Sequence, residues 1–305
     1  MNSILDILNK TTQYFEERTI EKPRLQAEHL IAHALGLKRM DLYLQAQRPL
    51  EERALAKIRP LVRRRAKREP LQYIIGETDF WKGTLNCQPG ALIPRPETEE
   101  LIEHTVGMWN QISDTPPRRI IDLGTGSGAI AIALASEYPA AEVCAVDSSS
   151  EALELAEENA RKNDLVKRIQ LAKSHWFTEI EGPFDLIVSN PPYLTQAEVD
   201  SAAPEVRDFE PTQALIGSDM DGAGDLRQIL LESKNMIDAS HPHLIALETG
   251  IAQHPALAQF AQEQAWPFTH SQKDLQSRHR FFFASHSPIG IQSTHADTVQ
   301  SDPRV

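Results

Sequence analysis

The sequence predicts an α/β protein, in which a doubly wound, mostly parallel sheet follows a small N-terminal all-helical domain and a β-hairpin joins the two. From about residue 97 onward, apolar runs of strand length alternate with helical stretches, which is the order of a parallel sheet covered by helices. A glycine-rich turn leads from the first of these strands into a helix, as in ligand-binding sheets of this kind. Before residue 75, the apolar residues follow helical spacing instead.

Residues 1–75 are expected to form helices that pack into a separate domain. Apolar residues between Leu5 and Phe15 fall on one face of a first helix. A second helix is expected between Pro23 and Gly36, because proline suits the first turn of a helix and glycine suits its end. The regularity of this spacing predicts a helical domain without strands.

Residues 76–96 are expected to link this domain to the sheet as a β-hairpin. The surrounding segment is rich in Tyr, Ile, Phe, Trp and Gly, which favours strands and tight turns. The two strands are predicted at Tyr73–Gly76 and at Leu85–Cys87.

Residues 97–286 are predicted to hold the sheet. Short apolar runs in this part of the chain have the length and composition of buried parallel strands. They are residues 120–123, 142–146, 169–171, 186–188 and 244–247. Residues 287–305 are polar and aperiodic, and we expect a disordered tail there.

The composition is that of an ordinary soluble protein. Of 305 residues, 41% are hydrophobic and 24% are charged. No run of 18 apolar residues is present and the first residues lack the features of a signal peptide, so neither a membrane span nor export is expected. The two cysteines, Cys87 and Cys144, lie far apart without metal-type spacing. We therefore expect a cytoplasmic protein without a disulfide framework or a metal site.

The charge is distributed unevenly along the chain. The net charge is −12, yet residues 1–75 hold 15 Lys and Arg against 9 Asp and Glu, a balance of +6, and the remainder carries −18. The acidic body argues against direct nucleic-acid binding, which needs clustered cations. The basic part peaks at residues 63–68, which form either the solvated end of a helix or a contact surface for an acidic partner.

The turn at residues 122–129, Asp-Leu-Gly-Thr-Gly-Ser-Gly-Ala, predicts a cofactor site at the end of the first strand. Asp147 follows the second strand, where a carboxylate is placed to accept both hydroxyls of a ribose. This pattern suits the adenosine of NAD or of S-adenosylmethionine. A second interpretation makes Asp147 a helix cap, but Ser148 and Glu151 have the spacing of a capping box, which would leave Asp147 free.

Asn190-Pro191-Pro192-Tyr193 is the most informative segment of the chain. It follows the apolar run 184–189, and two prolines in a row cannot continue a central strand, so the chain must leave the sheet there. The Asn190 side-chain oxygen and the Pro191 carbonyl are suited to accept hydrogen bonds from a planar NH2 group, on which Tyr193 could stack. The alternative is an ordinary proline-rich turn in which Asn190 and Tyr193 have no role in binding. A site for a planar nitrogen nucleophile favours methyl transfer from S-adenosylmethionine over hydride transfer to NAD.

The glycine turn, Asp147 and the tetrapeptide together resemble the pattern of class I S-adenosylmethionine-dependent aminomethyltransferases. Residues 69–76, Glu-Pro-Leu-Gln-Tyr-Ile-Ile-Gly, and 93–98, Ile-Pro-Arg-Pro-Glu-Thr, make the chain similar to the PrmC/HemK family. Residues 207–211, Arg-Asp-Phe-Glu-Pro, support the same resemblance. That family methylates the glutamine of the Gly-Gly-Gln motif in class 1 peptide chain release factors. Its sister family, which acts on a ribosomal-protein glutamine, usually carries Pro-Arg-Ser-Pro where this chain has Pro-Arg-Pro-Glu.

The resemblance implies a role for each matching residue. The catalytic loop would consist of Asn190, Pro191, Pro192 and Tyr193. The residues implied to bind S-adenosylmethionine are Gly124, Thr125, Gly126, Ser127, Gly128, Asp147, His175, Trp176 and Asn190. The glycine turn would hold the methionine end, Asp147 the ribose and Trp176 the adenine. Family members usually carry an acidic residue before the tryptophan, and His175 stands there in this chain.

Three alternatives stay open at this point. A ribosomal-protein glutamine methyltransferase would share most of these motifs. A nucleic-acid adenine N6-methyltransferase would use the same tetrapeptide, since adenine also offers a planar amine, but it would need a basic target-recognition surface. A non-enzymatic cofactor-binding protein would have little use for the catalytic loop. We expect class 1 release factors as partners, bound by the helical domain, with no direct contact to nucleic acid or membrane.

Overall fold

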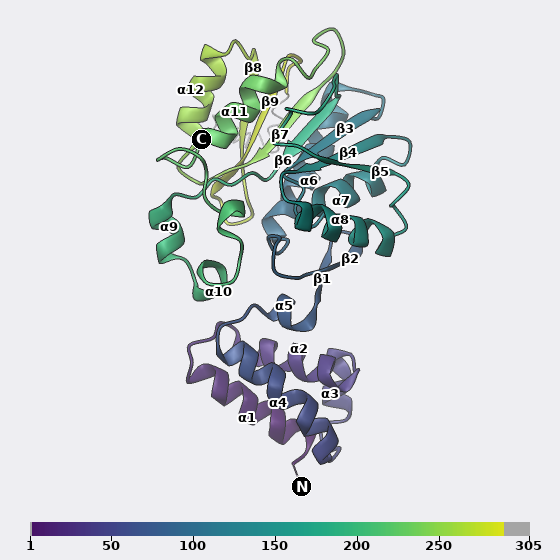
Figure 1. Cartoon of the computed structure of the whole chain (residues 1–305), viewed down its shortest axis with the longest axis vertical. Helices are drawn as coiled ribbons and strands as arrows, with labels where there is room; N and C mark the ends of the chain where they lie inside the picture. The colour runs from purple at the N-terminus through teal and green to yellow at the C-terminus, as the bar shows by residue number, and fades with distance from the viewer. Residues whose placement is uncertain (1, 290–305) are drawn as a thin grey trace, which may run out of the picture.

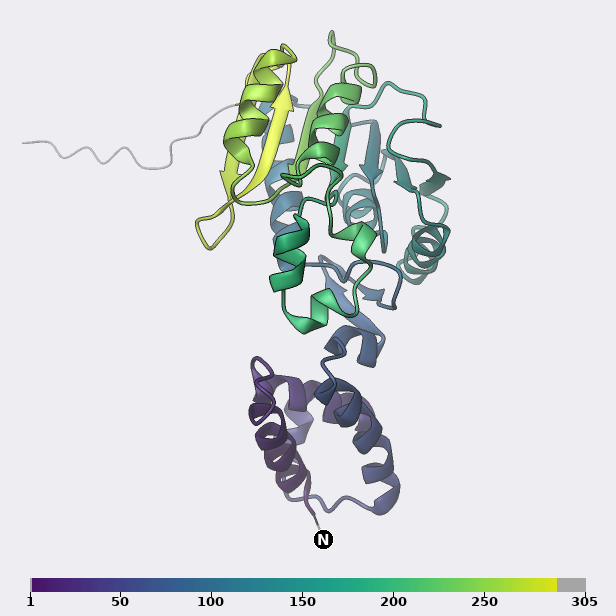
Figure 2. The ribbon, with the colours of Figure 1, turned by 60° about the vertical axis from the view of Figure 1, so that its left-hand side comes forward.

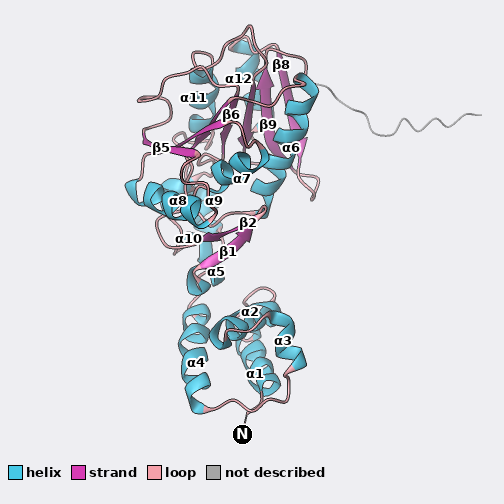
Figure 3. Cartoon of the chain, turned by 90° about the vertical axis from the view of Figure 1, so that its right-hand side faces the viewer, coloured by secondary structure: helices cyan, strands magenta, loops and turns pink. Residues whose placement is uncertain are grey.

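The computed structural model describes residues 2–289 and has two parts (Figure 1). A helical unit holds the N-terminal helices, and an α/β unit holds the sheet, with a short helix and a β-hairpin between them (Figures 1 and 3). Of the tail predicted over residues 287–305, the part from residue 290 onward lies outside the described residues.

The helical unit is built around apolar faces of its helices. The helices are α1 (Ile4–Glu16), α2 (Pro23–Leu35), α3 (Arg39–Leu44), α4 (Glu52–Ala66) and α5 (Leu71–Ile75). Ser3 begins α1 with a capping box, in which its Oγ accepts from the Asp6 N–H at 3.2 Å and Asp6 Oδ2 accepts from the Ser3 N–H at 2.9 Å. Leu8, Phe15 and Ile31 are buried in the core between the helices. Gly36 ends α2 in the left-handed region, as its position after the apolar run predicted.

The hairpin has its first strand later in the chain than predicted, whereas its second strand overlaps the one predicted at Leu85–Cys87. Its strands are β1 (Glu77–Phe80) and β2 (Gly83–Asn86), paired antiparallel. The predicted strand at Tyr73–Gly76 is wrong, because these residues form α5 and its glycine cap. The two buried side chains of α5 serve different cores: Ile74 packs in the helical unit, whereas Tyr73 packs beside Cys87 and donates its hydroxyl to the Ala91 carbonyl at 2.8 Å. Tertiary packing thus overrides the β-propensity of the segment.

The α/β unit contains a seven-stranded sheet within the described residues, in the order β5-β4-β3-β6-β7-β9-β8. The strands are β3 (Arg119–Leu123), β4 (Glu142–Asp147), β5 (Ile169–Lys173), β6 (Leu186–Ser189), β7 (Leu244–Glu248), β8 (Phe268–Lys273) and β9 (His279–Ser285). Strands β3 to β7 are parallel, which confirms each run predicted from the sequence. Strand β9 pairs antiparallel with both β7 and β8, and strands β8 and β9 add to the five that were predicted.

Helices cover both faces of the sheet (Figures 1 and 3). On one face α6 (Pro96–Ile112), α7 (Ala129–Glu137) and α8 (Ser150–Lys162) pack against one set of strand residues, and on the other α11 (Gly224–Ser233) and α12 (His254–Glu263) pack against the alternate set. Ile120 and Ile121, for example, lie in opposite cores. Because successive side chains of a strand point to opposite faces, continuous apolar runs are what a sheet covered on both sides needs.

The strand order reverses at β3. The chain runs from β3 outward through β4 to β5, and then crosses back to β6 on the other side of β3. The loops that leave β3 and β6 therefore diverge at the carboxyl ends of these strands, where open α/β sheets bind their ligands. This arrangement places residues 122–129 next to residues 190–193.

The segment after β6 connects the α/β unit with the helical unit. It contains α9 (Gln196–Ser201) and α10 (Pro204–Arg207), which lie on the side of the sheet that faces the helical unit (Figures 1 and 2). Glu205 accepts from Arg65 Nη2 at 2.6 Å and from Arg68 Nη2 at 2.8 Å. The Arg65 side chain is only 3% exposed. Two residues of the basic cluster 63–68 therefore form ion pairs with Glu205 within the molecule, while Arg63 remains exposed.

Asn159 on α8 joins the hairpin to the glycine turn. Its Oδ1 accepts from the Asn86 N–H at 2.6 Å, and its Nδ2 donates to the Ser127 carbonyl at 2.9 Å and to the Asn86 carbonyl at 3.2 Å. The side chain is fully buried. These contacts satisfy backbone groups at the end of β2 and in the glycine turn.

Asn159→Ala should lower the free energy of unfolding by about 2–3 kcal/mol, because it leaves buried backbone groups without partners. Chemical denaturation of the purified variant measures this difference. Asn163→Ala is the matched control on the next turn of α8, since Asn163 is only half-buried and donates to Thr84 and Asn159 carbonyls alone. A variant at Asn159 no less stable than this control would contradict the role described.

Candidate active site

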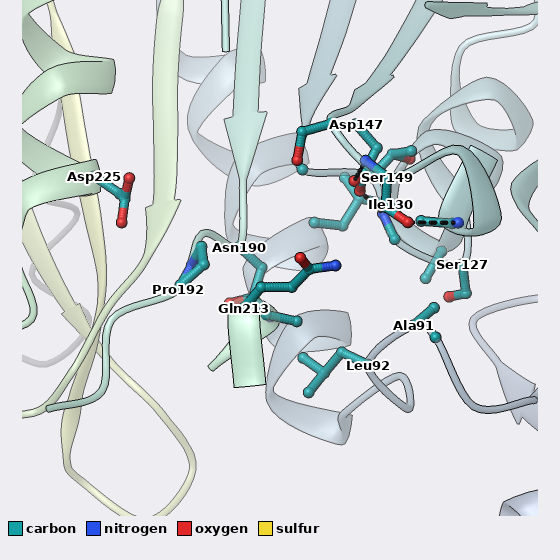
Figure 4. Close-up of a pocket in the computed structure, with 18 of the residues that line it drawn as sticks. Ala91, Leu92, Ser127, Ile130, Asp147, Ser149, Asn190, Pro192, Gln213 and Asp225 are labelled. Carbon is teal, nitrogen blue, oxygen red and sulfur yellow. Dashed lines mark hydrogen bonds between the residues drawn. The ribbon is translucent and has the colours of Figure 1, made fainter. Parts of the chain in front are cut away.

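A cavity of about 310 Å³ lies at the carboxyl ends of the central strands. It brings together most of the site residues predicted from the sequence, although they come from separate loops. The predicted site residues that line the cavity are Gly124, Thr125, Gly126, Ser127, Asp147, His175, Trp176, Asn190 and Pro192. Figure 4 shows Asn190 and Pro192 on one side of this cavity and Asp147, Ser149 and Ser127 on the other. Gly128, Pro191 and Tyr193 are not among the lining residues.

The glycine turn is packed closely against its surroundings. Gly128 has a φ of 83°, and a Cβ added to it would lie 3.2 Å from the Ala156 Cα on α8. It serves the packing of the turn on this helix, which explains why it does not line the cavity. A Cβ on Gly124, with a φ of 68°, would contact the Trp176 ring at 3.4 Å. The turn therefore lies against an aromatic ring on one side and a helix on the other.

Asp122, the first residue of this turn, is hydrogen-bonded both to the turn itself and to the first turn of α7. Its Oδ2 accepts from Thr125 Oγ1 at 2.6 Å and from the Ala131 N–H at 3.0 Å. Its Oδ1 is buried without a hydrogen-bond partner among the described residues. Burial raises the pKa of Asp122 to about 7, against the lowering effect of these two donors, and the nearby Asp147 raises it further.

Asp147 lies at the end of β4 and holds the glycine turn from the side. Its Oδ2 accepts from the Gly126 N–H at 2.9 Å, and its Oδ1 accepts from the Ser149 N–H at 2.9 Å. Burial raises the pKa of Asp147, while these backbone donors oppose the rise. Each carboxylate oxygen keeps a further lone pair, so Asp147 retains acceptor capacity toward the cavity.

The predicted helix cap after β4 is wrong by one residue. Ser149, not Ser148, caps α8, and its Oγ accepts from the Ala152 N–H at 3.2 Å. Strand β4 includes Asp147, so the helix begins later than the spacing of Ser148 and Glu151 suggested. Asp147 is consequently not free, since both of its oxygens order backbone at the start of the helix and in the glycine turn.

Trp176 and His175 form another wall of the cavity. Trp176 is buried with a φ of 48°, in the left-handed region that a bulky residue rarely adopts. Its indole Nε1 has no hydrogen-bond partner among the described residues. The exposed His175 ring stands edge-on to the indole, with 5.6 Å between the ring centroids. The strained backbone aims an apolar ring at the glycine turn and leaves an imidazole at the cavity rim.

The tetrapeptide begins where β6 ends. Ser189 Oγ donates to the Leu123 carbonyl at 2.7 Å and thereby ties the end of β6 to the end of β3. The half-buried Asn190 lines the cavity, and its Nδ2 donates to Thr98 Oγ1 at 3.2 Å. Tyr193 points elsewhere: its hydroxyl donates to Glu248 Oε1 at 3.0 Å. The tyrosine thus anchors the loop rather than lining the cavity.

Sequence reasoning missed the residues that hold this loop in place. Glu248 at the end of β7 is fully buried and accepts from Thr98 Oγ1 at 2.7 Å as well as from Tyr193. Arg280 Nη2 donates to the Tyr193 hydroxyl at 2.7 Å and to Glu248 Oε1 at 3.2 Å, and its guanidinium lies 5.1 Å from the centroid of the Tyr193 ring. Burial raises the pKa of Glu248, and Arg280 opposes this rise. The signal available in the sequence was a glutamate at the end of an otherwise apolar strand.

A second ion pair closes the cavity on the side of the linker. Arg95 Nη2 donates to Glu210 Oε1 at 2.7 Å and to Oε2 at 2.6 Å, and Glu210 is buried. This pair joins the loop before α6 to the segment that follows α10. Ala91 and Leu92 from the first of these loops, and Gln213 from the second, line the cavity beside Asn190 (Figure 4).

The cavity is lined by the Trp176 ring, the Asp147 carboxylate and the Asn190 amide. These groups are suited to bind a nucleoside next to a planar polar group. Within residues 2–289, no group of three or more His, Cys, Asp or Glu side chains is placed to hold a metal ion. In the same part of the chain, every helix is too short or too polar to cross a bilayer.

Two segments of the chain match known protein families. Residues 6–76 match the PrmC N-terminal domain, and residues 105–206 match the methyltransferase small domain. A release factor glutamine methyltransferase of Rhodopirellula baltica is 37% identical over 253 residues, which are 82% of this chain and 85% of that protein. One of Nitratidesulfovibrio vulgaris is 36% identical over 283 residues, which are 91% and 93% of the two chains.

A solved structure has a similar arrangement of strands and helices. The catalytic domain of human Mettl16, in complex with hairpin 6 of the MAT2A 3'UTR, superposes with a TM-score of 0.52 at 17% sequence identity. The match covers 66% of this chain and 75% of that one. At this identity the likeness shows the fold alone.

Asp122 should make the stability of the protein fall as the pH rises from about 4 to about 7. In this window the folded state keeps a proton that the unfolded state has lost, because the folded pKa is the higher one. The contribution of Asp122 is complete below the unfolded pKa and is lost as the pH rises through the folded pKa. Asp122→Asn, which is neutral throughout, should lose less unfolding free energy over the same window in urea titrations. Parallel pH profiles of the two proteins would show that Asp122 is already ionised at low pH.

Proposed function

Because the chain belongs to the release factor glutamine methyltransferase family, we propose that it methylates the Gly-Gly-Gln glutamine of class 1 peptide chain release factors. The methyl group would pass from S-adenosylmethionine to N5, the side-chain amide nitrogen. The α/β unit has the fold of class I S-adenosylmethionine-dependent methyltransferases. The observation that carries the proposal is that Asn190 and Pro192 line the same cavity as the glycine turn and Asp147.

The residues of the cavity fit S-adenosylmethionine. Asp147 retains acceptor capacity for the ribose hydroxyls, and the apolar Trp176 ring is a suitable surface for adenine. The backbone of residues 124–127 would hold the methionine end. His175 stands at the rim, where a neutral imidazole nitrogen is suited to accept from the adenine amino group. When bound, the cofactor supplies an electrophilic methyl group on a sulfonium.

The chain's own part in the reaction is to hold a poor nucleophile. An amide nitrogen shares its lone pair with the carbonyl, so it reacts slowly unless it is oriented. Asn190 Oδ1 and the Pro191 carbonyl would accept from the two N–H groups of the substrate glutamine. Two fixed acceptors favour the positive charge that develops on this nitrogen and direct its lone pair at the methyl group. The tetrapeptide contains no general base, and the proton would leave to water.

The decisive experiment is the transfer of labelled methyl from S-adenosylmethionine to a purified class 1 release factor. The matched control is the same factor with its Gly-Gly-Gln glutamine replaced by alanine. Ribosomal proteins, DNA and RNA in parallel reactions test the two alternative methyltransferase activities. Label on the intact factor only is the expected result, and label on any other substrate in its place would refute the proposal.

We also propose that the enzyme works in the cytoplasm, with the release factor as its direct partner and without binding nucleic acid or membrane itself. The net charge of −18 on residues 76–305 supports this, because it would repel phosphates. The helical unit, with its opposite charge, is the proposed contact for the release factor. A groove between α1 and α4, with a volume of about 420 Å³, combines apolar Ile7, Tyr14 and Val62 with cationic Lys10 and Arg63.

Asn190→Ala should raise the barrier to methyl transfer by about 3 kcal/mol, because one fixed acceptor is lost from the transition state. Single-turnover rates with saturating S-adenosylmethionine measure this effect, and calorimetry should find cofactor affinity changed much less. Asn235→Ala, at an exposed position after α11, is the control for the substitution itself. Methyl transfer at the wild-type rate by Asn190→Ala would exclude the proposed role.

Arg63→Glu should raise KM for the intact release factor several-fold and leave the affinity for S-adenosylmethionine unchanged. The reason is that the new carboxylate would repel an acidic surface of the partner, which the arginine would attract. Lys57→Glu is the matched control, since Lys57 is exposed on the same helix but does not line the groove. Steady-state kinetics with both variants separate a local contact from a general charge effect. An equal rise in KM for both variants would place the contact elsewhere.

A further inference from the structure

The side-chain amide of Asn190 has two ends that are nearly equal in size and opposite in chemistry. Its oxygen accepts hydrogen bonds and its NH2 group donates them. Packing alone distinguishes the two ends poorly. If the NH2 end faced the cavity, it would meet the N–H groups of a substrate amide, donor against donor. The orientation of this one amide therefore decides whether the tetrapeptide attracts or repels its substrate.

Glu248 sets the direction of hydrogen bonding in this region. It is fully buried, which raises its pKa, but it lies 3.2 Å from Arg280 Nη2, a cation that opposes this rise and favours the ionised carboxylate. An ionised carboxylate only accepts. The hydroxyls of Thr98, at 2.7 Å, and of Tyr193, at 3.0 Å, must therefore point their protons at Glu248.

Thr98 passes this constraint on to Asn190. It is buried in the first turn of α6. Its hydroxyl carries a single proton, and it donates this proton in the hydrogen bond to Glu248. Toward Asn190, at 3.2 Å, the Thr98 oxygen is thus an acceptor only. It pairs with the NH2 end of the amide and would be repelled by the oxygen end. The Asn190 oxygen is left for the cavity.

We propose that Thr98 and Glu248 are positioning residues for methyl transfer: together they fix the Asn190 amide with its oxygen toward the substrate. Neither residue needs to touch the reacting atoms, because both act through Asn190. The catalytic part of this inference rests on the proposed function, since it assumes an amide substrate, whereas the hydrogen-bond chain itself does not. Tyr193 and Arg280 share the same carboxylate and keep it in place.

Thr98→Val removes the hydroxyl and conserves the shape of the side chain. Its kcat for the release factor, at saturating S-adenosylmethionine, should fall by roughly tenfold or more, by analogy with the loss of residues that orient the ligands of a metal ion. The cofactor dissociation constant should stay close to wild type, whereas the melting temperature should fall, because the buried Glu248 loses one of its donors. Thr98→Ser restores the hydroxyl and should restore the rate. A Thr98→Val enzyme with wild-type kcat, or a Thr98→Ser enzyme as slow as Thr98→Val, would overturn the proposal.

A nuclear magnetic resonance experiment on the wild-type chain tests the orientation without any substrate. With the Asn190 side-chain signal identified through its loss in Asn190→Ala, nuclear Overhauser contacts are expected from its NH2 protons to the Thr98 methyl group. Absence of these contacts from the identified signal would overturn the proposal even if the Thr98 variants did not fold. If instead the contacts are found and the wild-type enzyme does not methylate release factor, the proposed function fails while the orientation of Asn190 stands.

Discussion

A carboxylate buried at the end of β7, that of Glu248, holds together the elements on one side of the cavity. Removing Glu248 from water is costly unless donors replace the water, and the structure draws them from three places: Thr98 on α6, Tyr193 in the loop after β6 and Arg280 on β9. Each donor fixes the element that carries it. One buried carboxylate thus joins the loop, the start of α6 and strand β9, which also pairs with β7 through its backbone.

The opposite side of the cavity follows the same principle with a second carboxylate. Asp147 accepts from the backbone of Gly126 and of Ser149, and so fixes the glycine turn relative to the start of α8. The two loops that diverge from the strand reversal are therefore each held by an acidic residue at the end of a neighbouring strand. Preorganisation of this kind lets a site act through fixed dipoles, without rearrangement during the reaction.

The sequence was a good guide to the parallel strands and to the loops that follow them. The parallel strands followed from their apolar runs, and the glycine turn and the tetrapeptide were found at the strand ends where the topology requires them. Contacts between distant segments could not be predicted, because no spacing rule links Thr98 to Glu248 or Arg65 to Glu205. Local propensity also failed at Tyr73, where packing against two cores selects a helix over a strand.

Glu205 and Glu210 give the segment after the catalytic loop two attachments, one to Arg65 and Arg68 in the helical unit and one to Arg95 in the linker. The same segment continues directly from Tyr193. A rotation of the helical unit against the sheet would have to break buried ion pairs or drag this segment along. The orientation of the helical unit and the position of this segment are therefore coupled through ion pairs, so that a release factor bound to the helical unit, as proposed above, would act on the loop that carries Asn190.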